Sequence, residues 1–175
     1  MDFVVEPRNH ILFTGDSITD CGRRNNANPP LGCGYVKLAT DLMEARYPSH
    51  KLTFTNTGIG GNTVRDLTER WTEDVIKHQP DWLSIMIGIN DLHRFLAGDP
   101  GLGPEHYEKN YRVLLQRVRQ ETNAKLVLME PFYMRLKPED DHQAAVLDLL
   151  PRYLEIAHGL AREFEARFVR TQSAF

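Results

Sequence analysis

Cysteine is scarce in this chain. Its 175 residues include two cysteines, Cys21 and Cys33, which are too few for a disulfide scaffold. They also lack the paired spacing that a zinc site requires. We therefore expect two reduced thiols, and the histidines offer no pair at metal-ligand spacing, so no metal site is expected.

Long apolar runs and an excess of basic residues are also missing. No stretch of about twenty apolar residues occurs. The N-terminal segment reaches Pro7 and Arg8 before any apolar run long enough for a signal peptide. The formal net charge of -3 gives no basic field that would attract a phosphate backbone. The sequence thus predicts a cytoplasmic protein with neither membrane nor nucleic acid as a partner.

The chain instead has the composition of a folded globular protein. It is 41% hydrophobic and 26% charged, and 175 residues suffice for one domain that buries roughly 70% of the surface of its unfolded form. Apolar runs of strand length alternate with stretches of helical period, a pattern typical of an α/β fold with a parallel sheet between helices. The predicted strands span 10–14, 51–56, 82–87, 125–130 and 167–171, and the predicted helices span 35–47, 64–75, 107–118 and 153–164, with Pro151 near the first turn of the last one.

Polar, glycine-rich segments follow the first three strands. They are Gly15 to Thr19 (GDSIT), Asn56 to Thr63 (NTGIGGNT) and Gly88 to Asp91 (GIND). Because the carboxyl ends of parallel strands meet at one edge of a sheet, we expect these three segments to lie together. A serine directly after a buried strand and a glycine stands where a nucleophile is needed.

The same segments offer groups that could stabilise an oxyanion. Backbone N–H groups at Gly60 and Gly61 can approach a ligand closely, and Asn90 carries a side-chain amide. Each feature alone is more often a helix cap or a turn, so their coincidence at consecutive strand ends is what indicates a site. No Gly-Lys-Ser/Thr follows a glycine cluster, and GIGGNT does not match the dinucleotide fingerprint.

GDSIT, NTGIGGNT and GIND resemble the first three motif blocks of the SGNH (GDSL) hydrolase family. The similarity extends to TDCGR, to GYVKLATDL and TVRDLTERWTEDVIKHQPDW in two predicted helices, and to MEPFY after the fourth strand. Within the family the chain is most similar to bacterial acetylxylan esterases, which are intracellular enzymes. The resemblance implies a three-layer α/β/α fold with a five-stranded parallel sheet in the flavodoxin-like order 2-1-3-4-5.

The resemblance also implies a mechanism of acyl transfer without metal or cofactor. Ser17 would be the nucleophile, and the N–H groups of Ser17 and Gly61 with the Asn90 amide would form the oxyanion hole. The partner would be a small-molecule ester, with an acetylated sugar favoured over a short-chain lipid or aryl ester. A homo-oligomer stays open.

Four further residues are placed at the substrate crevice by the motif positions: Asp16, Gly60, Asp91 and His93. For Asp16 and Asp91 we favour a structural role, in which their carboxylates bond local backbone N–H groups and hold turns. His93 stands where the relatives carry tryptophan, which would make the pocket wall smaller and more polar.

The family's fourth block, an Asp-x-x-His that supplies the general base, does not occur in the 175 residues. We therefore expect residues 1–175 to be a single domain that lacks the end of the family fold, including its final helix. Glu139-x-x-His142 and Glu155-x-x-His158 have related spacing; His142 could reach the crevice rim, whereas His158 falls within a predicted helix. The alternative is a ligand-binding protein that has kept the crevice and lost the base.

Overall fold

The computed structural model describes residues 4–25, 29–137 and 139–174. The described residues do not include the two ends of the expected 1–175 domain, Phe175 among them, or residues 26–28 of the loop between the two cysteines. Within the described part, Cys21 and Cys33 are free thiols. No helix there is both long enough and apolar enough to cross a membrane.

The centre of the molecule is a five-stranded parallel sheet in the order β2-β1-β3-β4-β5. This order confirms the fold class that the sequence predicts. The strands are β1 (His10–Gly15), β2 (Thr53–Asn56), β3 (Trp82–Met86), β4 (Lys125–Met129) and β5 (Arg167–Val169). β1 and β3 are buried along nearly their whole length, as the continuous apolar runs of a doubly covered parallel sheet require.

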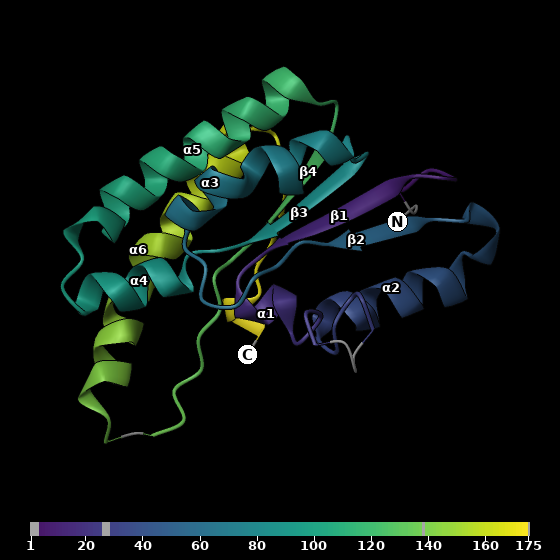
Figure 1. The fold of residues 1–175 in the computed structure, drawn as a ribbon. Coiled ribbons are helices and arrows are strands. Elements are labelled where there is room, and N and C mark those ends of the chain that lie inside the picture. The colour runs from purple at the N-terminus through teal and green to yellow at the C-terminus, as the bar shows by residue number, and fades with distance from the viewer. Residues whose placement is uncertain (1–3, 26–28, 138, 175) are drawn as a thin grey trace.

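Helices lie on both faces of the sheet, but unequally (Figure 1). α3, α5 and α6 cover one face, while α1 and α2 lie on the other. The helices are α1 (Ser17–Asp20), α2 (Tyr35–Arg46), α3 (Val64–Asp74), α4 (Ile89–Leu96), α5 (Pro104–Glu121) and α6 (Asp141–Glu163). Two apolar clusters follow from this arrangement, a large one under α3, α5 and α6 and a small one that includes Val36 of α2.

Alternation along the strands decides which side chain enters which cluster. Leu12 and Leu83 point to the large cluster, whereas their neighbours Phe13 and Trp82 point to the small one. The apolar residues at spacings of three and four along the helices complete the large cluster, as predicted. Each fully buried side chain of this size contributes about 1.5–3 kcal/mol.

Two helix predictions were wrong. The last helix begins at Asp141, so that Pro151 lies inside it rather than in its first turn. Val146 and Leu150 extend the buried face of Tyr153 at the same spacing, and this continuous burial outweighs the hydrogen bond that proline cannot donate. The second error was an omission, because residues 89–96, beginning within GIND, form helix α4.

Candidate functional site

The ends of β1, β2 and β3 meet as the sequence predicts. Phe13 pairs with Asn56, and Gly15 pairs with Met86, so the segments after the three strands leave the sheet at the same edge. Gly15 allows this close approach, because a Cβ atom there would lie 2.1 Å from the carbonyl oxygen of Met86. Ser17 lies in the first of these segments, two residues after the end of β1.

Ser17 is exposed, although most of its neighbours are buried. It is the first residue of α1, and Asp16 caps that helix by accepting a 2.9 Å hydrogen bond from the Ile18 N–H. Asp16 is 1% exposed, and burial raises the pKa of its carboxyl to about 6. The local bond that we expected for Asp16 is therefore present, and it fixes the turn that presents Ser17.

The glycine loop after β2 lies against Ser17. A Cβ atom on Gly60 would be 3.7 Å from the Ser17 Cβ. The Gly60 N–H is already engaged, because it donates a 2.9 Å hydrogen bond to the Asp20 carboxylate, which also pairs with Arg24 at 2.9 Å. Sequence reasoning missed Asp20; its position four residues before Arg24, where the two can form an ion pair, was the available signal.

Gly61 differs from Gly60 in both conformation and bonding. Its φ of +82° is one that glycine adopts at little cost. Its carbonyl accepts a 2.7 Å hydrogen bond from Arg94, while its N–H has no partner among the described residues. Gly61 is therefore the glycine of the pair whose N–H remains available to a ligand.

Asn90 lies in the first turn of α4 and faces the same loop. Its side-chain amide donates a 3.0 Å hydrogen bond to the carbonyl of Asn62, which leaves its second N–H without a partner in the described part of the chain. The bond to Asn62 fixes the direction of this free N–H. Ser17, Gly61 and Asn90 thus belong to three segments that lie against one another at the same edge of the sheet.

Asp91 turns away from the crevice. It is fully buried, and both carboxylate oxygens lie 3.1 Å from the Val64 N–H at the start of α3. The carboxyl also bonds its own backbone N–H, which is the local bond expected for it, and the bond to Val64 joins α4 to a segment 27 residues away. Burial raises the pKa of this carboxyl to about 7.

His93 lies one helical turn after Asn90 and pairs with a histidine from a distant segment. Its Nδ1 lies 3.1 Å from Nε2 of His142, at the start of α6. The two rings are stacked, with centroids 5.3 Å apart, and the Tyr133 ring meets His93 edge-on at 5.2 Å. His142 thus contacts α4 through His93, whereas His158 stacks on Phe168 of β5.

Comparison with known proteins identifies the family of this chain. The model of the GDSL-like lipase/acylhydrolase family matches residues 13–175. The chain belongs to this family. It is therefore a carboxylic ester hydrolase. The matched residues include Ser17, Gly61 and Asn90.

The relatives of this GDSL-like hydrolase are similar over most of its length. An acetylxylan esterase of Geobacillus stearothermophilus is 41% identical over 173 residues, which cover 94% of this chain and 77% of the relative. The crystal structure of Axe2, an acetylxylan esterase of the same organism, matches with a TM-score of 0.85 and 37% identity over 98% of this chain and 80% of that one. A GDSL-like lipase of Parabacteroides merdae matches with a TM-score of 0.87, 36% identity and coverages of 97% and 80%.

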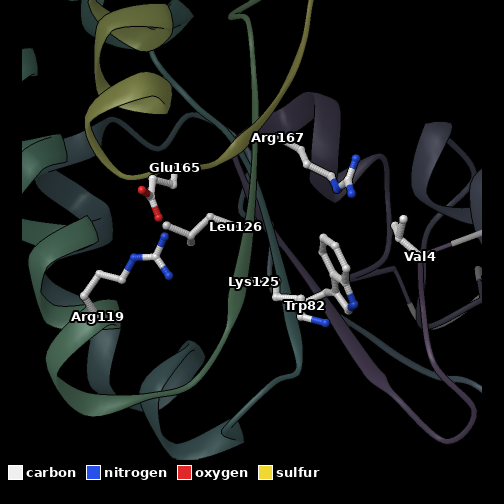
Figure 2. Close-up of a pocket in the computed structure, with 7 residues that line it drawn as sticks. All are labelled: Val4, Trp82, Arg119, Lys125, Leu126, Glu165 and Arg167. Atoms are coloured by element: carbon white, nitrogen blue, oxygen red, sulfur yellow. The ribbon is translucent and has the colours of Figure 1, made fainter.

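A cavity elsewhere in the GDSL-like hydrolase does not belong to this site. It has a volume of about 530 Å³ and includes the first residues of β3, β4 and β5, so it opens at the opposite edge of the sheet (Figure 2). Lys125 and Arg167 lie 5.4 and 5.9 Å from the centre of the Trp82 ring, and Arg119 faces Glu165. This cavity contains none of the three segments that follow β1, β2 and β3.

Neither crevice nor cavity has the donors for a metal centre. Within residues 4–25, 29–137 and 139–174, no group of three or more histidine, cysteine, aspartate or glutamate side chains could hold a metal ion. His93 and His142 form a pair without a third such ligand.

Proposed function

We propose that this hydrolase removes acetyl groups from acetylated xylo-oligosaccharides through an acyl-enzyme at Ser17. The observation that carries the proposal is the meeting of an exposed Ser17 with two N–H groups that have no partner among the described residues, those of Gly61 and Asn90. The Geobacillus relatives favour acetylxylan as the substrate class.

The proposed reaction has two steps. The Ser17 oxygen attacks the ester carbonyl as its proton passes to a histidine base, and the Gly61 and Asn90 N–H groups bind the resulting oxyanion. The tetrahedral intermediate then collapses, the sugar hydroxyl leaves with the proton, and acetyl-Ser17 remains. Water attacks this ester by the same route, which releases acetate and restores Ser17.

The proposal requires a histidine base. Solved structures of Axe2 include catalytic mutants in which a serine, an aspartate or a histidine is replaced, the latter two being three positions apart in that enzyme. The 175 residues here contain no Asp-x-x-His.

The polar rim of the crevice supports a hydroxyl-bearing substrate. Asn62 and Arg94 bond Asn90 and Gly61 directly, and His93, which contacts Tyr133, follows Asn90 in α4. Each of these four side chains carries a group that can bond a hydroxyl. A long acyl chain would require apolar surface instead. A cytoplasmic location and a homo-oligomer stay predictions.

The direct test compares esters of different acids and alcohols. We expect release of acetate from acetylated xylo-oligosaccharides and hydrolysis of 4-nitrophenyl acetate, with kcat/KM falling at least tenfold from the acetate to the octanoate ester. Ser17→Ala removes both activities. Ser49→Ala, an exposed serine in the short 3-10 helix Pro48–His50 before β2, is the matched control and retains them. Equal or greater activity on octanoate would contradict the acetyl assignment, and an active Ser17→Ala would contradict the nucleophile.

A further inference from the structure

Two imidazoles and a phenol gather at the crevice from three separate segments. His93 comes from α4, His142 from the first turn of α6, and Tyr133 from the segment between β4 and α6. The His93–His142 hydrogen bond of 3.1 Å joins residues 49 positions apart. Tyr133 is itself held by Gln172, which accepts a bond from its N–H at 2.8 Å and donates one to its carbonyl at 3.0 Å.

This group stands beside the two free N–H groups. His93 follows Asn90 by three residues in α4, so both lie on the same side of that helix. The next residue, Arg94, bonds the Gly61 carbonyl at 2.7 Å, which fixes α4 against the glycine loop. The imidazole pair therefore lies next to the part of α4 that carries Asn90 and packs on the glycine loop.

The hydrogen bond between the rings determines what they offer to a ligand. A neutral imidazole has one N–H donor and one nitrogen acceptor. If His93 Nδ1 donates to His142 Nε2, then His93 Nε2 is an acceptor and His142 Nδ1 a donor; if the proton lies the other way, both roles are exchanged. In either tautomer the pair presents one donor and one acceptor.

A hydroxyl group is the ligand that such a pair suits, because it is also one donor and one acceptor. The pair can adapt to either orientation of the hydroxyl by exchanging its tautomer. Burial and the neighbouring His142 lower the pKa of His93 below 6.5, so this ring is neutral at pH 7.

We propose that the His93–His142 pair is the subsite for the alcohol half of the ester, where it binds a hydroxyl group next to the acylated oxygen. This inference rests on the esterase function proposed above and adds a substrate requirement to it. The enzyme would then prefer esters of vicinal diols, the chemistry of a partly acetylated sugar, over esters of alcohols without a second hydroxyl. Sites that bond a substrate hydroxyl discriminate against the analogue that lacks it.

Two esters that differ in one hydroxyl test the subsite: the monoacetate of cyclohexane-1,2-diol and cyclohexyl acetate. The quantity of interest is the ratio of kcat/KM for the first to that for the second. We expect His93→Phe and His142→Phe each to lower this ratio about 3- to 10-fold, the effect of one lost hydrogen bond. In the double variant this ratio should lie within about twofold of its value in the single variants, because the two rings act as one unit.

Two further variants separate recognition from structure. His93→Gln keeps one donor and one acceptor and should restore at least half of the wild-type ratio. His78→Phe changes an exposed histidine in the 3-10 helix Ile76–His78 before β3, at the opposite edge of the sheet, and should leave the ratio unchanged. Thermal unfolding of each variant verifies that it is folded.

Three results would overturn the subsite. The first is an unchanged ratio in both phenylalanine variants, and the second is a double variant in which the effects of the two substitutions on the ratio add. The third is a loss of kcat/KM of more than about 1,000-fold for both esters. The last would identify one histidine as the general base instead. Failure of the proposed function gives a different result, since the wild-type protein would then hydrolyse neither ester.

Discussion

Asp91 gives the chain a dependence of stability on pH that can be worked out from its surroundings. The carboxyl is fully buried, and it accepts a hydrogen bond from the Val64 N–H. Its pKa is about 7 when folded, against 3.8 in the unfolded chain. The folded state therefore retains a proton that the unfolded state releases. The contribution of this protonated carboxyl to the free energy of unfolding is complete below about pH 4 and is lost as the pH rises to about 7. The loss is up to about 4 kcal/mol.

Asp91→Asn removes the ionisation and keeps an oxygen for the Val64 N–H. We expect the variant to gain about 2–4 kcal/mol relative to the wild-type protein between pH 4 and pH 7.5. Urea unfolding followed by circular dichroism at several pH values measures this difference. Asp41→Asn, at an exposed position in α2, is the control. Parallel pH curves for wild type and Asp91→Asn would refute the raised pKa.

Three further substitutions test the site. Asn90→Ala should lower kcat for acetate esters about 10²- to 10³-fold with little change in KM, because it removes an oxyanion donor; a loss below fivefold would exclude that role. Gly15→Ala should reduce the free energy of unfolding by about 1–3 kcal/mol in a denaturant titration, since its Cβ would meet the Met86 carbonyl at 2.1 Å. Asp20→Ala leaves the Gly60 N–H without its bond and should cost about 1–3 kcal/mol, and an unchanged unfolding midpoint would show that water replaces the carboxylate.

The strands were predictable because their signals are local: each is an apolar run, and the first three end in a glycine turn. Their order in the sheet was implied by the family resemblance. The segments around Ser17, Gly61 and Asn90 converge because strand ends in a parallel sheet must do so. The structure of the segment after β3 was harder to predict. The polar residues of GIND favour a loop, yet α4 begins within this segment.

The hydrogen-bond partners of the site residues could not be predicted from the sequence. Nothing in the spacing shows that Asp20 occupies the Gly60 N–H or that Asp91 bonds Val64, because both bonds join separate segments. The His93–His142 contact depends on where α6 begins, and the sequence placed that start after Pro151. Long-range contacts of this kind are set by packing of whole helices and not by local propensity.

The central claim is that Ser17 is the nucleophile. Intact-mass spectrometry of the purified protein and its Ser17→Ala variant, after exposure to a fluorophosphonate probe, tests it most directly. We predict one adduct on the wild-type protein and none on the variant, with hydrolysis of 4-nitrophenyl acetate lost in parallel. A folded wild-type protein with neither adduct nor turnover, or an adduct that persists in Ser17→Ala, would contradict the claim.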